Sequence, residues 1–348
     1  MKVLPIKDFN YSKVKLDKKD KLILYYLLKN ARLPISKIAN LVKTKRENVN
    51  YRINRLKESQ VITGFRTAIN TRDLGYLSFH LFLELPEMSE DNMDKITKQL
   101  KNNKHVNVII TYSGRWNLEL GIFAKDVNQF REILIEIFSK LTVKDYKVLI
   151  LGQTIKTSIL PKSFFSELEV NNHSLEHTKN DTSFHKDFLE ANKSNTQLDE
   201  KDKKVLTILG KDASKKIIDL AKQTALSKET VISRIKKLIH NKIIIDFRPV
   251  INYYSLGFSV QTILLRLSSS GYKDVQEIEN FIKSKDEILW ATYTAGEADI
   301  LIYALTKSQE DIHTLMNSFR NNFPNEIASF ENLFAYEEHK YLFYPEEL

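Results

Sequence analysis

Two stretches of the chain, 182 residues apart, repeat each other position by position. Residues 16–20 and 198–202 share the pattern Leu-Asp-x-x-Asp, and 198 minus 16 gives the offset of 182. The same offset relates the glycines of the two stretches, Gly75 with Gly257 and Gly114 with Gly296. Shared glycines and apolar positions at one fixed spacing indicate two copies of one folding unit. Duplicated units commonly bury equivalent faces against each other, so we expect a pseudo-two-fold dimer within one chain.

The first part of each copy has the pattern of three short helices. Asp17, with Asp20 three residues later and an apolar run behind it, predicts the N-cap of the first helix. Pro34 favours the start of a second helix over residues 35–42, and a regular apolar stripe predicts a third over 46–59.

A β-rich stretch over residues 61–69 follows, and Gly64 in it predicts the turn of a small hairpin. Three helices and a hairpin are typical of a winged helix-turn-helix, which we expect over residues 16–74. The second copy predicts helices near 199–209, 217–224 and 228–241 and a wing at 243–251, within a domain over 198–256.

From Gly75 the periodicity changes to strand, helix, strand, strand, helix, strand. The expected elements are strands 77–85, 106–112, 118–124 and 146–155 and helices 91–102 and 127–141. This order is the ferredoxin-like one, expected over 75–160 and again over 257–348. The fold class is therefore α+β: two copies of an N-terminal winged helix-turn-helix followed by a ferredoxin-like βαββαβ domain.

Two segments lie outside the repeat. Residues 1–15 form a basic lead-in without an assignment, and residues 161–197 form a linker rich in Asn, Ser, Lys and Glu. One helical piece is expected in that linker, around residues 184–191.

Composition favours an intracellular protein and permits a polyanionic partner, although a Lys-rich, AT-biased genome would give the same basic excess. The chain has 53 Lys and Arg against 44 Asp and Glu, a net charge of +9, and no cysteine. The absence of cysteine excludes disulfides, thiolate metal sites and thiol catalysis. No signal peptide or run of about 18 apolar residues occurs, so we expect a cytoplasmic protein without a membrane partner.

The third helix of each copy carries polar and basic side chains opposite its apolar stripe. Such side chains suit base edges in a DNA major groove, while Arg and Lys suit phosphates, although a solvated helix face would show similar residues. The candidate DNA-binding residues of the first copy are Lys45, Arg46, Glu47, Asn48, Tyr51, Arg52, Asn54 and Arg55. Those of the second copy are Ser227, Lys228, Glu229, Thr230, Ser233, Arg234, Lys236 and Lys237.

Several motifs in fixed order, each present twice, resemble the Lrp/AsnC family of transcriptional regulators. In the first copy they are Leu16-Asp-x-x-Asp20, Ile38-Ala39, Val49-x-x-Arg52-Ile53-x-Arg55-Leu56, Val61-Ile62, Ile69-Asn70 and Leu74-Gly75. In the second they are Leu198-Asp-x-x-Asp202, Leu220-Ala221, Val231-x-x-Arg234-Ile235-x-Lys237-Leu238, Ile243-Ile244, Ile251-Asn252 and Leu256-Gly257. The resemblance implies a sequence-specific regulator that binds double-stranded DNA, dimerises through its sheets and forms further homo-oligomers.

The resemblance also implies that an amino acid or related small molecule binds between the effector domains, near a Gly-x-x-Asp loop. The second copy has Thr294 and the loop Gly296 to Asp299, whereas the first has Tyr112 and the loop Gly114 to Asn117. Because a neutral Asn cannot pair with an ammonium group as Asp does, the second copy is the better candidate. Alternatively, both glycines serve only a turn between adjacent strands.

The two copies depart from the family pattern in different ways. Ser227 stands at the N-cap of the second recognition helix, as in many family members, whereas Lys45 stands there in the first. Gln60 and Lys242 replace the glycine that usually precedes the wing. These differences, with those on the recognition helices, predict two unequal DNA-binding heads and an asymmetric operator.

Catalytic signals are weak, and we expect neither a catalytic residue nor a cofactor nor a metal. His173 and His177 have helical spacing but lack acidic companions arranged as in a metalloprotease motif, and His80, His105 and His313 look isolated. An enzyme remains the alternative, because siroheme decarboxylases resemble this family in architecture and also work as paired copies. A third reading is a metabolite sensor in which one copy has lost DNA binding.

Overall fold

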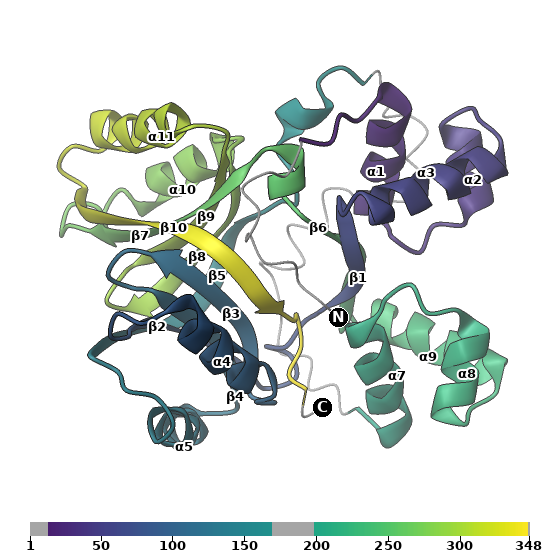
Figure 1. Ribbon diagram of the computed structural model, residues 1–348, viewed down its shortest axis with the longest axis horizontal. Coiled ribbons are helices and arrows are strands. Elements are labelled where there is room, and N and C mark those ends of the chain that lie inside the picture. The colour runs from purple at the N-terminus through teal and green to yellow at the C-terminus, as the bar shows by residue number, and fades with distance from the viewer. Residues whose placement is uncertain (1–12, 169–197, 347–348) are drawn as a thin grey trace. The chain divides into compact units, whose positions relative to one another are not determined.

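The computed structural model describes residues 13–168 and 198–346, which form two compact units (Figure 1). The barrel unit contains residues 76–161 and 257–341. The head unit contains residues 13–75, 162–168, 198–256 and 342–346. The helix expected around 184–191 lies outside the described residues. Within the described ranges, no helix is long and apolar enough to cross a membrane.

Each head is built on three helices, as the apolar periodicity predicts. The first head has α1 (Lys18–Lys29), α2 (Ile35–Leu41) and α3 (Arg46–Glu58). The second has α7 (Glu200–Lys211), α8 (Ile217–Thr224) and α9 (Lys228–His240). The predicted N-cap is confirmed: the Asp17 carboxylate accepts a hydrogen bond from the Asp20 backbone N–H at 2.8 Å, and Asp20 reciprocates in a capping box.

The predicted hairpin after the third helix is wrong. Residues Ile62–Ile69 form one continuous strand, β1, and Gly64 lies within it at a shift of register instead of at a turn. The partner of β1 is β6 (Ile244–Ile251) of the other head, with which it forms a two-stranded antiparallel sheet. The hydrogen-bonding partner of this strand is therefore the equivalent strand of the second copy, and not a neighbouring segment of its own copy.

This sheet joins the two heads through reciprocal contacts. Strand β1 packs on α7 of the second head, and β6 packs on α1 of the first. The Thr67 hydroxyl of β1 donates to the Leu209 carbonyl at 2.7 Å, and the Ala31 N–H after α1 donates to the Phe247 carbonyl of β6 at 2.7 Å. Because each head supplies a strand to the other, the two are one folding unit.

The two positions before these strands, where glycine is usual in the family, have left-handed backbones. Gln60 and Lys242 both have φ of 57°. A side chain in this region is less favourable than glycine, yet both residues are accommodated because the Val61 and Ile243 N–H groups still bond to the preceding helices.

The barrel unit has the predicted order of elements twice. The first half contains β2 (Leu77–Glu84), α4 (Glu90–Lys101), β3 (Val106–Ser113), β4 (Leu118–Ala124), α5 (Val127–Phe138) and β5 (Asp145–Thr157). The second contains β7 (Ser259–Leu267), α10 (Val275–Ser284), β8 (Ile288–Gly296), β9 (Ile300–Thr306), α11 (Gln309–Asn322) and β10 (Ile327–Tyr341). The strands do not form two separate sheets: β3 pairs with β10 and β5 with β8, so all eight close into one barrel.

The barrel has apolar cores on both sides of its wall. Alternate residues of β2 to β5 pack outward with Leu100, Phe130 and Ile133 of helices α4 and α5, and the second half packs likewise on α10 and α11. The opposite faces of both halves meet inside the barrel, where residues such as Phe82 and Leu264 share one cluster. The barrel is therefore a filled core to which each copy contributes one inner face.

The last strand of each half continues into an aromatic segment that packs within the head unit. After β5, the Phe165 ring lies edge-on to Tyr25 of α1, with centroids 5.6 Å apart. After β10, Tyr344 is fully buried against α7 at Gly210, and the Arg248 guanidinium lies over the Phe343 ring. Each first helix is thus covered by the end of its own copy.

Candidate nucleic-acid interface

The outer face of α3 presents both charged and uncharged polar side chains to solvent. Val49, Ile53 and Leu56 are buried, which turns the opposite side outward. The Tyr51 side chain is 66% exposed, which is a large fraction for an aromatic residue. The predicted residues that are exposed on or beside this helix are Lys45, Arg46, Glu47, Asn48, Tyr51 and Asn54. This face offers an aromatic hydroxyl and amides, which can both donate and accept hydrogen bonds.

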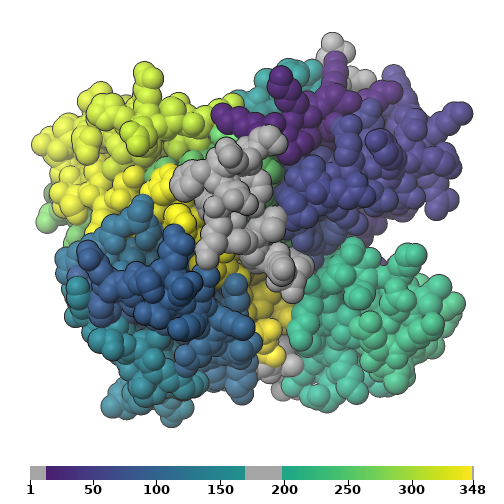
Figure 2. Space-filling view, in the orientation of Figure 1, coloured from purple at the N-terminus to yellow at the C-terminus, as the bar shows by residue number. Residues whose placement is uncertain are grey.

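The outer face of α9 is more cationic than that of α3. Ser227 caps the helix by accepting a hydrogen bond from the Thr230 N–H at 3.1 Å, whereas Lys45 makes no side-chain cap on α3. The predicted residues that are exposed here are Ser227, Lys228, Glu229, Ser233, Lys236 and Lys237. Figure 2 shows surface atoms of the first head in purple-blue and of the second head in green. Lys236 takes the place of Asn54, so a positive charge replaces an amide at that position.

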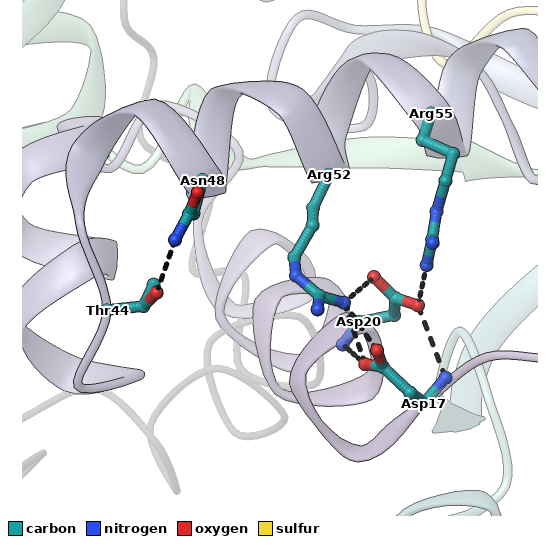
Figure 3. A network of polar contacts seen from close by, with 6 residues as sticks. All are labelled: Asp17, Asp20, Thr44, Asn48, Arg52 and Arg55. Atoms are coloured by element: carbon teal, nitrogen blue, oxygen red, sulfur yellow. Dashed lines mark hydrogen bonds and ion pairs between the residues drawn. The ribbon is translucent and has the colours of Figure 1, made fainter.

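Two of the predicted DNA-binding cations of the first head are engaged inside the head. Figure 3 shows Arg52 and Arg55 reaching from α3 to the acids at the start of α1. The Arg52 guanidinium lies 2.7 Å from carboxylate oxygens of both Asp17 and Asp20, and Arg55 forms an ion pair with Asp20. The Asp20 side chain is fully buried, so these contacts compensate a charge that is removed from water.

The second head repeats this arrangement at the equivalent positions. Arg234 pairs with Asp199 and, at 3.0 Å, with the buried Asp202, while the Lys237 ammonium lies 3.0 Å from Asp202. Hydrogen bonds from the Asp202 backbone and the Arg234 guanidinium hold the pKa of Asp199 below its ordinary value. The Leu-Asp-x-x-Asp motif and the third-helix cations therefore hold the helices of each head together.

The predicted effector residues of the second copy are tied into the connection between β8 and β9. The Asp299 carboxylate accepts the Leu267 N–H at 2.8 Å and the Tyr272 hydroxyl at 2.5 Å, and the Thr294 hydroxyl donates to the Ala298 carbonyl at 2.8 Å. Gly296 has φ of 137°, and a Cβ there would lie 2.1 Å from the Val148 carbonyl oxygen of β5. Glycine is required at this position on both counts.

The first copy uses its amide for the equivalent contact. Asn117 accepts the Leu85 N–H and donates to the Leu85 carbonyl, both at 3.0 Å, and Leu85 is the counterpart of Leu267. Gly114 has φ of 118° with open space around it. The Tyr112 hydroxyl is directed away from this loop contact, into the barrel, where it meets Glu119 and lies 2.9 Å from Thr262. Both loops thus connect adjacent strands through the same backbone anchor.

One cluster was missed in the sequence. His80 is not isolated: its ring nitrogen contacts the fully buried Glu119, which also accepts from Tyr112 and, at 2.6 Å, from the Tyr303 hydroxyl. Burial and the charge of Glu119 raise the pKa of Tyr303 well above its ordinary value. A glutamate at an inward position of the apolar strand β4 was the available signal. His105 and His313 take no part in this cluster.

Few features of the described residues suggest a small-molecule or metal site. No group of three His, Cys, Asp or Glu that could hold a metal ion occurs in the parts that the structure describes. A hollow of about 180 Å³ lies between the ends of α4 and α5, lined by residues such as Asn103, Glu136 and Lys140. It is smaller than a typical ligand pocket and includes none of the predicted effector residues.

Comparison with known proteins gives the family. A profile of winged helix-turn-helix DNA-binding domains matches residues 16–63, and one of AsnC-type helix-turn-helix domains matches residues 198–239. An HTH-type transcriptional regulator of Pyrococcus abyssi that is itself uncharacterised is 33% identical over 116 residues, which are 33% of this chain and 78% of that protein. The chain belongs to the Lrp/AsnC family of transcriptional regulators. It is a DNA-binding regulator with two heads.

Other relatives agree with this assignment. The transcriptional regulator Ptr1 of Methanocaldococcus jannaschii is 36% identical over 116 residues, 33% of this Lrp/AsnC chain and 76% of that protein. Among solved structures, the siroheme decarboxylase NirDL superposes with a TM-score of 0.61 and 14% identity, covering 93% of this chain and 92% of its own. At that identity the similarity concerns the fold alone.

Proposed function

We propose that the two heads bind double-stranded DNA together, as one pair of unlike recognition helices. The observation that carries this proposal is the β1–β6 sheet, which makes the heads a single folding unit while α3 and α9 keep their outer faces exposed. In this proposal each domain keeps the boundaries expected from sequence, and each half of the barrel counts as one ferredoxin-like copy. Half-sites then lie about one helical turn or a multiple apart.

The first head recognises bases and the second adds more phosphate contacts. Tyr51 and Asn54 of α3 are exposed, and an Asn amide can form a bidentate pair with adenine. At the equivalent positions α9 has Ser233 and Lys236, so it exchanges an amide for a charge suited to phosphate. In the bound state, Arg52 and Arg234 keep their ion pairs with Asp20 and Asp202 and so hold the recognition helices in place. The operator is therefore asymmetric.

The test is selection of bound genomic fragments followed by footprinting and gel shifts at several salt concentrations. Asn54→Ala is expected to relax base preference in one half-site, at a cost of about 1–3 kcal/mol. Lys236→Ala is expected to weaken binding to all sequences and to reduce the salt dependence by about one phosphate contact. Lys98→Ala, an exposed cation of α4, is the control for a general loss of charge. A strict inverted repeat as operator would contradict the proposal.

An amino acid or related small molecule is the proposed effector, with the Asp299 loop as its first candidate site. Membership of the family supports this proposal, and the Tyr272 hydroxyl already contacts one carboxylate oxygen of Asp299. Titration of the DNA complex with each amino acid tests it: a shift in affinity that is lost in Asp299→Asn supports the site. An unchanged affinity with all of them means regulation without such an effector.

An enzyme is the second candidate, because the NirDL fold covers nearly the whole chain. A NirDL structure contains an iron-uroporphyrin III analogue, and a tetrapyrrole would be the corresponding ligand of this chain. We propose that the chain is not an enzyme, since its relatives are named regulators and the buried contact of His80 with Glu119 is already occupied by two tyrosine hydroxyls. An absorbance band on titration with an iron tetrapyrrole, with turnover, would reverse this choice.

A further inference from the structure

The inner faces of the two barrel halves are built from unlike residues at equivalent positions. The offset of 182 pairs every inner position of the first half with one of the second. Five such pairs surround the Glu119 cluster: His80 with Thr262, Val108 with Trp290, Tyr112 with Thr294, Glu119 with Leu301, and Gly121 with Tyr303. The outward residues of the same strands are mainly aliphatic in both halves, so the largest of these differences lie on the faces that meet inside the barrel.

The first difference is one of volume. In the second half, Trp290 and Tyr303 are neighbours on β8 and β9, and their rings stack with centroids 5.2 Å apart. In the first half the corresponding neighbours are Val108 and Gly121, and a Cβ on Gly121 would lie 2.6 Å from Cβ of Val108. One half therefore contributes two large aromatic side chains where the other contributes almost no bulk.

The second difference is one of polarity. The first half supplies a fully buried carboxylate, Glu119, and the second half has Leu301 in its place. One donor to this carboxylate crosses from the other half, since the Tyr303 hydroxyl lies 2.6 Å from Oε1 of Glu119. A second contact also crosses, because the Tyr112 hydroxyl lies 2.9 Å from the Thr262 hydroxyl.

Pairing of like halves would lose both the complementary side-chain volumes and the hydrogen bonds that cross between the halves. Two first halves would bury two carboxylates without the Tyr303 hydroxyl and leave a void where Trp290 and Tyr303 now lie. Two second halves would have to accommodate four large rings, with each Tyr303 hydroxyl facing Leu301. Unsatisfied buried charges, cavities and overpacking are each strongly unfavourable.

We infer that the inner face of each barrel half is an interaction surface specific for the unlike half, and that it excludes pairing with the like half of a second copy of this chain. The partner of the first half is then always a second half. Every barrel that this chain forms therefore combines one first half with one second half, whether the two come from one chain or from two. This inference does not depend on DNA binding, and it concerns a surface that no DNA-binding residue shares.

The test exchanges the five residue pairs. One chain receives first-half residues in the second half through Thr262→His, Trp290→Val, Thr294→Tyr, Leu301→Glu and Tyr303→Gly. A second receives His80→Thr, Val108→Trp, Tyr112→Thr, Glu119→Leu and Gly121→Tyr, and a third carries all ten changes. The first two are expected to lower the urea midpoint by about 1 M or more or not to fold. The third is expected to recover at least half of that loss and the mass of the wild-type assembly.

A milder cycle keeps the inference testable if the five-residue changes prevent folding. Glu119→Gln and Tyr303→Phe are made singly and together and unfolded in urea. Their effects are expected to be non-additive by at least about tenfold in the unfolding equilibrium constant, because the two side chains share one contact. Tyr293→Phe is the control, since its hydroxyl bonds to Glu279 within one half. Additive effects, or a ten-residue exchange no more stable than its parents, would overturn the inference.

Discussion

The two heads share the contacts that fold them and differ in the side chains that they present. In each head a third-helix arginine binds the acids of the first helix, Arg52 with Asp20 and Arg234 with Asp202. On the outer faces, Tyr51 of the first head corresponds to Ser233 of the second, and the Tyr51 side chain is largely exposed to solvent. The comparison separates cations that hold a head together from residues that are available to DNA, a distinction that net charge alone does not reveal.

The largest expected effect comes from removing the shared contacts of one head. In Arg52→Ala/Arg55→Ala the buried Asp20 loses both cations, which should destabilise the head unit by about 2–3 kcal/mol. Hydrogen exchange of the α3 amides and urea unfolding followed by circular dichroism measure this loss. Arg46→Ala removes an exposed cation of the same helix and should change stability by less than about 0.5 kcal/mol. Equal effects of the two variants would contradict the separation.

The helices were predictable from sequence because their signals are local. Asp17 and Asp20 predict the start of α1, and the apolar stripe of α3 predicts which side of that helix is buried. The pairing of β1 with β6 was not predictable, because Gly64 resembles a turn residue and the true partner lies in the other copy. Likewise His80 looked isolated, since its partners are on other strands and only the closed barrel brings Tyr303 to Glu119.

The two barrel halves also differ in a titratable residue: His339 of β10 corresponds to Thr157 of β5. Burial, with the positive charge of Lys101, lowers the pKa of His339 to about 4. An unfolded histidine has a pKa of about 6.5, so between these values the unfolded chain binds a proton that the folded chain does not. The free energy of unfolding should therefore fall as pH decreases from 7 to 5.

His339→Gln isolates this contribution. The wild type should lose about 1.6 kcal/mol more than this variant between pH 6.5 and pH 5, as measured by urea unfolding at each pH. His313→Gln changes an exposed histidine and should leave the pH dependence as it is. A wild-type profile that runs parallel to that of His339→Gln would show that the buried ring is not responsible.

A smaller difference concerns the ends of the two copies. Gly210 in the last turn of α7 corresponds to Leu28 of α1, and a Cβ on Gly210 would lie 2.6 Å from the Tyr344 ring. Gly210→Ala should therefore destabilise the second head by about 1 kcal/mol, although alanine favours helix by a similar amount. In a Tyr344→Ala background the sign should reverse. Urea unfolding of the four proteins measures this, and the same sign in both backgrounds would contradict the role of Tyr344.

The smallest difference is at the start of the recognition helices, and it can be exchanged with one residue. Ser227 caps α9, whereas Lys45 leaves the first turn of α3 without a side-chain acceptor. Lys45→Ser should stabilise α3 and Ser227→Ala should destabilise α9, each by about 0.5–1 kcal/mol, because the hydroxyl accepts an otherwise unpaired backbone N–H. Protection of the first-turn amides in hydrogen exchange distinguishes the two helices within one sample. If Lys45→Ser brings α3 to the protection of α9 while DNA selectivity stays unequal, the difference between the heads lies in their outer faces and not in the stability of their helices.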